Sequence, residues 1–195
     1  MIPLYDEKRI KGGIPFAVIS LIVLNTIFFL VAYSDLNHYI NLFGFSPAKI
    51  WDGQFFTAFT AMFLHGNIWH LLINMWFLWV FGNNLESRLG TLKFLAFYFL
   101  CGIGGSIIYA LAMADPNAAV IGASGAISGV LGGYLVLFPR NKIRTFFISL
   151  PAVVYIFLWF LYQLFSAGKV DTSVAYWGHI GGFVFGILFI KLFKK

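Results

Sequence analysis

The chain has 195 residues, of which 61% are hydrophobic and only 10% are charged. Soluble domains carry roughly 25% charged residues, so this composition excludes an ordinary soluble domain and predicts an all-α protein that crosses a membrane several times. The net charge of +6 does not indicate nucleic-acid binding, because the basic residues lie between apolar segments. A single cysteine, Cys101, excludes a disulfide framework or a thiolate metal site within the chain.

Six apolar runs approach the length of about 20 residues that a membrane-spanning helix needs. In chain order they cover residues 14–33, 66–82, 92–113, 121–138, 143–165 and 175–193. Pro151 predicts a kink in the fifth run, because proline removes a helical hydrogen bond. The first run lacks a clear signal-peptide cleavage site, so we expect it to stay as a helix. One membrane domain over 1–195 is therefore expected.

The basic residues between the runs predict an orientation. With the N-terminus in the cytoplasm, only Lys49 and Lys169 would lie outside. The cytoplasmic segments would hold Lys8, Arg9, Lys11, Arg88, Lys93, Arg140, Lys142, Arg144, Lys191, Lys194 and Lys195. This positive-inside bias predicts six spans with both termini in the cytoplasm. The location we expect is a prokaryotic cell membrane.

The first outside connection, residues 34–65, is too polar to span and too apolar for an ordinary loop. Ser46 is placed as an N-cap, with Pro47 at the first helical position. Aromatic residues recur after it at roughly helical spacing, at Trp51, Phe55, Phe56 and Phe59. We expect a short helix that lies in the outer leaflet without crossing it. An interfacial anchor with no other role explains this helix equally well.

Polar side chains inside spans are costly, so each is a functional candidate. His70 and Asn74 lie four residues apart and share one helix face. Hydrogen bonding between helices explains this pair at least as well as catalysis does. Ser124 and His179 lie in the fourth and sixth runs, each a few residues from the predicted outer end.

Glycines at four-residue spacing predict that the fourth and sixth helices pack closely. The two ridges are Gly125, Gly129 and Gly133, and Gly178, Gly182 and Gly186. Such packing would bring Ser124 and His179 together at matched depth, as a serine nucleophile and its base require. Packing alone explains the glycines but not the matched histidine.

Four motifs together resemble the rhomboid intramembrane serine proteases. They are "GASG" at 122–125, "HGNIWHLLIN" at 65–74, "GHIGG" at 178–182 and "ESRLG" at 86–90. Each is short, but their order and their places on the spans make the set specific. The resemblance covers the six-span core and implies a six-helix rhomboid-type bundle.

The resemblance also implies roles. Ser124 would be the nucleophile and His179 the general base, in a dyad without a carboxylate. His70, Asn74 and the Ser124 backbone N–H would stabilise the oxyanion. Supporting residues would be His65, Gly122, Gly125, Gly182, Glu86 and Arg88. No metal or cofactor is implied, and the substrates would be single-span membrane proteins cleaved near their outer ends.

The chain departs from the family pattern in two places. No arginine follows Trp51 or occurs anywhere in 34–65, and we expect Gln54 to replace its anchoring role. Relatives often carry at position 128 an aromatic that stacks on the catalytic histidine, whereas this chain has Ser128. A neighbouring ring, Tyr176 or Trp177, is expected to take its place.

Three other functions remain as alternatives. A metal enzyme would use His65, His70 and His179, although their spacing lacks a joint ligand pair. A non-catalytic relative would bind membrane helices, but it would typically lack the serine or the histidine. A transporter would need buried charges and inverted repeats. For the protease, we expect the loop 166–174 to form a mobile lid and the kinked fifth helix to border a lateral entrance.

Overall fold

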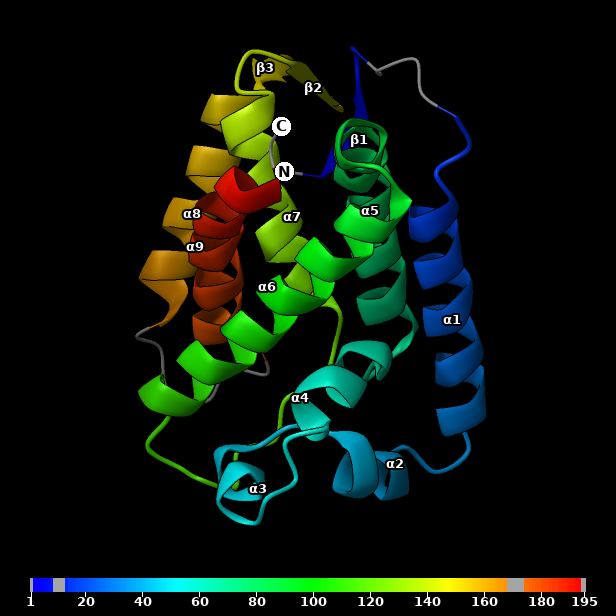
Figure 1. The fold of residues 1–195 in the computed structure, drawn as a ribbon, viewed down its shortest axis with the longest axis vertical. Helices are drawn as coiled ribbons and strands as arrows, with labels where there is room; N and C mark the ends of the chain where they lie inside the picture. The colour runs from blue at the N-terminus through cyan, green and yellow to red at the C-terminus, as the bar shows by residue number, and fades with distance from the viewer. Residues whose placement is uncertain (1, 9–12, 168–173, 194–195) are drawn as a thin grey trace.

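The computed structural model describes residues 2–8, 13–167 and 174–193. Long helices form most of the bundle, with short helices at one end and a small sheet at the other (Figure 1). The elements are β1 (Pro3–Asp6), α1 (Phe16–Ala32), α2 (Leu36–Phe43), α3 (Pro47–Trp51), α4 (Thr57–Thr60), the 3-10 helix η1 (Ala61–Phe63), α5 (Ile68–Leu89), α6 (Thr91–Ala112), α7 (Ser124–Leu137), β2 (Lys142–Thr145), β3 (Ser149–Pro151), α8 (Ala152–Ala167) and α9 (Tyr176–Phe193).

A long helix lies in each of the six predicted apolar runs: α1, α5, α6, α7, α8 and α9. Among the described helices, α6 and α9 are long and apolar enough to cross a membrane by length and composition, and α1, α7 and α8 are shorter apolar helices. The helical fold is therefore as expected, whereas six crossings stay a prediction.

The prediction for the fifth run is wrong over residues 143–151. Residues 142–151 form β2 and β3 instead of helix, and α8 begins only at Ala152. Pro151 ends β3 and so kinks no helix. The hairpin forms because β2 also pairs with β1 from the N-terminus, which completes a three-stranded antiparallel sheet in the order β1-β2-β3. Asp6 of β1 accepts hydrogen bonds from Tyr134, Asn84 and Asn141.

The first outside connection also differs from the single expected helix. It consists of α2, α3, α4 and η1. Ser46 stands at the N-cap position of α3 and Pro47 in its first turn, as predicted, but the Ser46 side chain makes no cap hydrogen bond. Lys49 ties the end of α2 to α3, because its Nζ lies 2.7 Å from the carbonyl oxygens of Asn41 and Gly44. That Gln54 replaces the family's arginine stays a prediction. Gln54 contributes its backbone N–H, which donates to the Lys49 carbonyl.

The predicted contact between the fourth and sixth helices is present, as α7 packs on α9. A Cβ built on Gly182 would lie 1.9 Å from the Gly125 carbonyl oxygen, and one on Gly186 would lie 2.1 Å from the Gly129 carbonyl oxygen. The sequence analysis missed a third partner, α6, where a Cβ on Gly105 would lie 2.6 Å from the Gly178 carbonyl oxygen. Gly178 itself has room, because a Cβ there would meet no atom closer than 3.8 Å.

Exposed apolar side chains cover the outside of the bundle, including Phe28 on α1, Trp69 on α5 and Phe157 on α8. A soluble protein rarely exposes such continuous apolar surface. The described basic residues gather at the sheet end: Lys8, Arg88, Lys93, Arg140, Lys142, Arg144 and Lys191 lie in or next to the strands and helix ends found there (Figure 1). Lys49 lies at the opposite end, on α3. The charge asymmetry expected from the sequence thus exists in space.

Glu86 fastens α1 to the bundle. Its two carboxylate oxygens accept hydrogen bonds from the backbone N–H groups of Ala17 and Val18, at 2.8 and 2.9 Å, and Oε1 also accepts from the Thr91 hydroxyl. The first N–H groups of a helix lack partners within the helix, so this buried carboxylate supplies the cap of α1. Arg88, by contrast, is exposed in the last turn of α5.

Candidate active site

Ser124 is the first residue of α7, at the helix end that faces α2–α4 rather than the sheet (Figure 1). The fourth helix thus begins later than the predicted residue 121, because the preceding segment is held as a loop by the first connection. Val120 and Phe45 exchange two backbone hydrogen bonds, and the Gly122 N–H donates to the Ala61 carbonyl at 2.8 Å. Gly122 has φ +119°, which disfavours a side chain and lets the chain turn sharply into α7.

His179 lies in the first turn of α9, beside Ser124. The Ser124 Oγ is 2.7 Å from the His179 Nε2, within hydrogen-bond distance. This contact depends on the close approach of α7 and α9, because Gly125 and Gly182 follow the two side chains by one and three residues. The structure therefore brings together the serine and histidine that the sequence analysis paired.

The second ring nitrogen of His179 also has a partner. Its Nδ1 lies 2.9 Å from the Oε1 of Gln163, a buried side chain on α8. Of the two rings expected to support the histidine, Tyr176 lies edge-on with centroids 6.3 Å apart, and Trp177 is exposed. Sequence reasoning missed Gln163, although a glutamine inside "FLYQLF" is itself a polar residue in an apolar run.

Ser128, one turn beyond Ser124, is buried and points along its own helix. Its hydroxyl donates to the Ser124 carbonyl oxygen at 2.6 Å. This bond leaves the Ser128 hydroxyl occupied by the backbone. Ser128 therefore packs within α7.

Of the expected oxyanion donors, His70 lies closest to the turn before Ser124. A Cβ on Gly122 would lie 2.8 Å from the His70 Cε1 and Nε2 atoms. The His70 Nδ1 lies 3.3 Å from the Gly66 N–H and accepts its hydrogen bond, so in the neutral ring the proton is on Nε2. That N–H is a donor beside Gly122, two residues before Ser124. Asn74 is buried one turn further along α5, and its Nδ2 donates to the His70 carbonyl at 2.9 Å.

His65 lies before α5, and its ring packs against the ring of His70. The two rings meet edge-on with centroids 5.0 Å apart, and His65 is almost completely buried. Burial, and then the nearby charge of His70, lower the pKa of His65 to about 3. His65 is therefore a neutral packing residue near neutral pH. On α3, burial lowers the pKa of the Lys49 ammonium as well.

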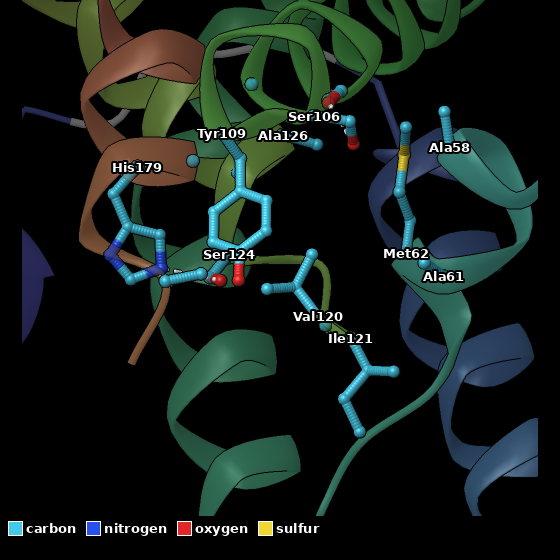
Figure 2. Close-up of a pocket in the computed structure, with 16 residues that line it drawn as sticks. Ala58, Ala61, Met62, Ser106, Tyr109, Val120, Ile121, Ser124, Ala126 and His179 are labelled. Atoms are coloured by element: carbon cyan, nitrogen blue, oxygen red, sulfur yellow. Dashed lines mark hydrogen bonds between the residues drawn. The ribbon is translucent and has the colours of Figure 1, made fainter. Parts of the chain in front are cut away.

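A cavity of about 40 Å³ lies beside the serine and histidine (Figure 2). Its walls come from the first connection, from α6, from the segment before α7 and from α9, and they include Met62, Tyr109 and Ile121. Figure 2 shows Ser124 and His179 directed toward each other at its edge. The volume exceeds the roughly 10–15 Å³ that one water needs. The cavity can thus hold water beside Ser124 and His179.

Within residues 2–8, 13–167 and 174–193, no cluster of three or more His, Cys, Asp or Glu side chains could hold a metal ion. His65 and His70 are neighbours, while His179 contacts Ser124 and Gln163. Most of the loop expected to act as a lid, residues 168–173, lies outside the described residues, as does Lys169.

The sequence of the chain matches one class of membrane proteins. The family model of the rhomboid domain matches residues 52–195, and the chain belongs to the rhomboid family. Rhomboid proteins are integral membrane proteins.

Several relatives are named as rhomboid proteins or proteases. The chain is 35% identical over 142 residues to the mitochondrial rhomboid protein 1 of Saccharomyces cerevisiae, an alignment that covers 66% of this chain and 39% of that protein. It is 34% identical over 152 residues to rhomboid-like protease 3 of Toxoplasma gondii, covering 73% and 53%. It is 35% identical over 138 residues to the rhomboid protease GluP of Bacillus subtilis, covering 69% and 25%. The chain thus spans about half or less of the length of these relatives, and their bacterial and mitochondrial origins do not narrow down its own membrane.

Proposed function

We propose that the chain is an intramembrane serine endopeptidase that uses Ser124 and His179 as a catalytic dyad. The observation that carries this proposal is the 2.7 Å contact between the Ser124 Oγ and the His179 Nε2. Membership of a family with named proteases supports it. The paired side chains also lie in two of the motifs that carry the resemblance, "GASG" and "GHIGG".

In the first step the Ser124 Oγ attacks the carbonyl carbon of the scissile bond while its proton passes to the His179 Nε2. The tetrahedral oxyanion then collapses, the C–N bond breaks, and the imidazolium gives its proton to the leaving amine. Water from the adjoining cavity attacks the acyl-enzyme with His179 again as base, which releases the acid product and restores Ser124. Neutral histidine suits both proton transfers near neutral pH.

The oxyanion would form at the start of α7, between His70 and the Ser124 backbone N–H. The first N–H groups of a helix are without intrahelical partners and carry the positive end of the helix dipole. The His70 Nε2–H adds a donor from α5, and Asn74 has a second amide hydrogen beyond the one given to the His70 carbonyl. Each donor aimed at the developing charge is worth roughly 3–4 kcal/mol.

The proposed substrate is a single-span membrane protein cleaved near the outer end of its helix, after a small residue. The exposed apolar surface of the bundle would face lipid, while Ser124 and His179 lie at the helix ends away from the basic sheet end. The basic end would be cytoplasmic by the positive-inside rule. We therefore propose that the whole chain forms one rhomboid-type domain with six crossings and both termini in the cytoplasm.

The protease proposal is tested with purified protein in detergent, a fluorophosphonate probe and a model transmembrane substrate. Wild type is expected to label and cleave, whereas Ser124→Ala should do neither. Ser128→Ala is the matched control, one turn away with its hydroxyl bonded to the backbone, and should keep most of its activity. His179→Ala should lose cleavage. Cleavage that survives Ser124→Ala would disprove the mechanism, and loss on chelation would favour a metal enzyme.

The alternative, a non-catalytic binder of membrane helices, predicts a different outcome. Such a protein would retain the model substrate without cleaving it, and Ser124→Ala would leave retention unchanged. The presence of both dyad residues in contact favours the protease.

Orientation has its own test. Cys101 is buried, so cysteines introduced at exposed positions can be labelled selectively in intact cells with a membrane-impermeant maleimide. Trp51→Cys on α3 should react from outside, whereas Phe147→Cys between β2 and β3 should react only after lysis. The reverse pattern would place the site on the cytoplasmic face.

A further inference from the structure

Gln163 is a buried amide in an otherwise apolar helix, and it points at the proposed base. It lies on α8, is 4% exposed, and holds its Oε1 2.9 Å from the His179 Nδ1. The residue on the other side of the ring is Ser124, whose Oγ is 2.7 Å from Nε2. His179 is thus held between side chains from two different helices, α7 and α8.

The chemistry of these partners decides where the imidazole proton lies. An amide oxygen can only accept a hydrogen bond, so the His179 Nδ1 facing the Gln163 Oε1 must carry the proton. A neutral imidazole has one proton, so Nε2 then has a free lone pair toward Ser124. This is the tautomer that can accept the serine proton. The opposite tautomer would place an N–H against the Ser124 hydroxyl and could not act as its base.

The Tyr176 ring, which also lies beside His179, does not fix the tautomer of the imidazole. Tyr176 lies edge-on at a centroid distance of 6.3 Å, and its hydroxyl is near the Tyr162 hydroxyl, at 3.5 Å. Ser128, at the position where relatives often carry an aromatic, bonds to the backbone of α7. With no aromatic at position 128, the hydrogen bond from α8 orients the ring.

We propose that Gln163 is a positioning residue, which holds His179 in the tautomer that activates Ser124 and so makes alignment of the dyad depend on the position of α8. This inference rests on the proposed protease function. An amide replaces the carboxylate of a serine–histidine–aspartate triad in orienting the ring, but it does so without a charge to stabilise the imidazolium.

The test compares Gln163→Met, which keeps length but removes the acceptor, with Gln163→Glu, which keeps an acceptor and adds charge. Gln163→Met should lower kcat about fivefold with KM unchanged, as expected for a lost neutral hydrogen bond. The rate of fluorophosphonate labelling of Ser124 should fall equally. Leu164→Met, the next residue on α8 and half exposed, is the control and should behave as wild type.

Gln163→Glu provides the readout that a merely structural role would not change. Among the residues that the structure describes, the titratable side chains around His179 are His70 on α5, Tyr109 on α6, Tyr162 on α8 and Tyr176 on α9. A carboxylate added beside Nδ1 stabilises the imidazolium, so the acidic limb of kcat/KM against pH should move up by about one pH unit. Activity above that limb should be retained.

The results separate this inference from the proposed function. Wild-type kcat in Gln163→Met together with an unshifted limb in Gln163→Glu would overturn the role of Gln163 while leaving the Ser124-dependent protease intact. If Gln163→Met does not fold, the limb of Gln163→Glu alone decides. Cleavage that does not depend on Ser124 would instead overturn the protease and this inference with it.

Discussion

Gly182→Ala tests whether the close approach of α7 and α9 aligns the dyad. The new Cβ would lie 1.9 Å from the Gly125 carbonyl oxygen, and real Cβ contacts are essentially never closer than 3.0 Å, so the two helices must separate by about 1 Å. The Ser124–His179 contact is only 2.7 Å long and lies within one turn of this point. Separation by that distance breaks the hydrogen bond, and a misplacement of about 1 Å costs on the order of 100-fold in rate.

The assay is kcat/KM with a transmembrane substrate, beside thermal unfolding in the same detergent. Overpacking should also destabilise the fold by about 1–3 kcal/mol. Gly178→Ala is the matched control on the same helix, because its Cβ would meet nothing closer than 3.8 Å. We expect it to match wild type in rate and stability. If Gly182→Ala retains the wild-type rate, the dyad does not depend on this contact and our account of the glycines is wrong.

Three further predictions concern the supports of the site. Glu86→Ala should destabilise the fold by about 3 kcal/mol in thermal unfolding, since it uncaps the buried N–H groups of Ala17 and Val18, and Glu86→Gln should cost less. Lys49→Met should lower stability by about 1 kcal/mol and increase proteolysis in the first connection; unchanged cleavage there would contradict its anchoring role. The pKa of His65 is about 3 in the folded protein and 6.5 in the unfolded chain. Between these pH values the unfolded chain binds more protons, so the free energy of unfolding falls as the pH drops. His65→Phe should flatten this loss between about pH 7 and about pH 4.5, and an equally steep loss would assign it to another group.

The long helices were predictable because each contains a long apolar run. Such a run is a local signal that can be read without knowing which distant segment packs against it. The fifth run shows the limit of that signal. Residues 146–151 are apolar enough for a span, yet they belong to the β2–β3 hairpin, whose first strand pairs with Pro3–Asp6, more than 130 residues earlier in the chain. Local apolarity alone cannot distinguish a short strand from the start of a helix.

Within the site, Ser124 and His179 were predictable as a pair because each carries a chemical signature and a glycine ridge beside it. Gln163 was missed because its importance depends on which face of α8 meets α9, and no spacing within "FLYQLF" reveals that register. Lys49 was missed for a related reason. Its ammonium reaches the last carbonyls of a helix that the sequence did not predict as a separate element.

The small sheet fixes the N-terminal end of α8. The first two N–H groups of α8, on Ala152 and Val153, donate to the carbonyls of Asn141 and Pro139, so this end is bonded to the hairpin and, through it, to the N-terminal strand. Gln163 lies eleven residues along the helix, about 16 Å from the anchor. A tilt of only about 10° about the sheet would carry its amide about 3 Å, as far as the whole length of its bond to His179. A helix pushed aside by an arriving substrate would therefore also disengage the amide from the base, and its return would align the base again.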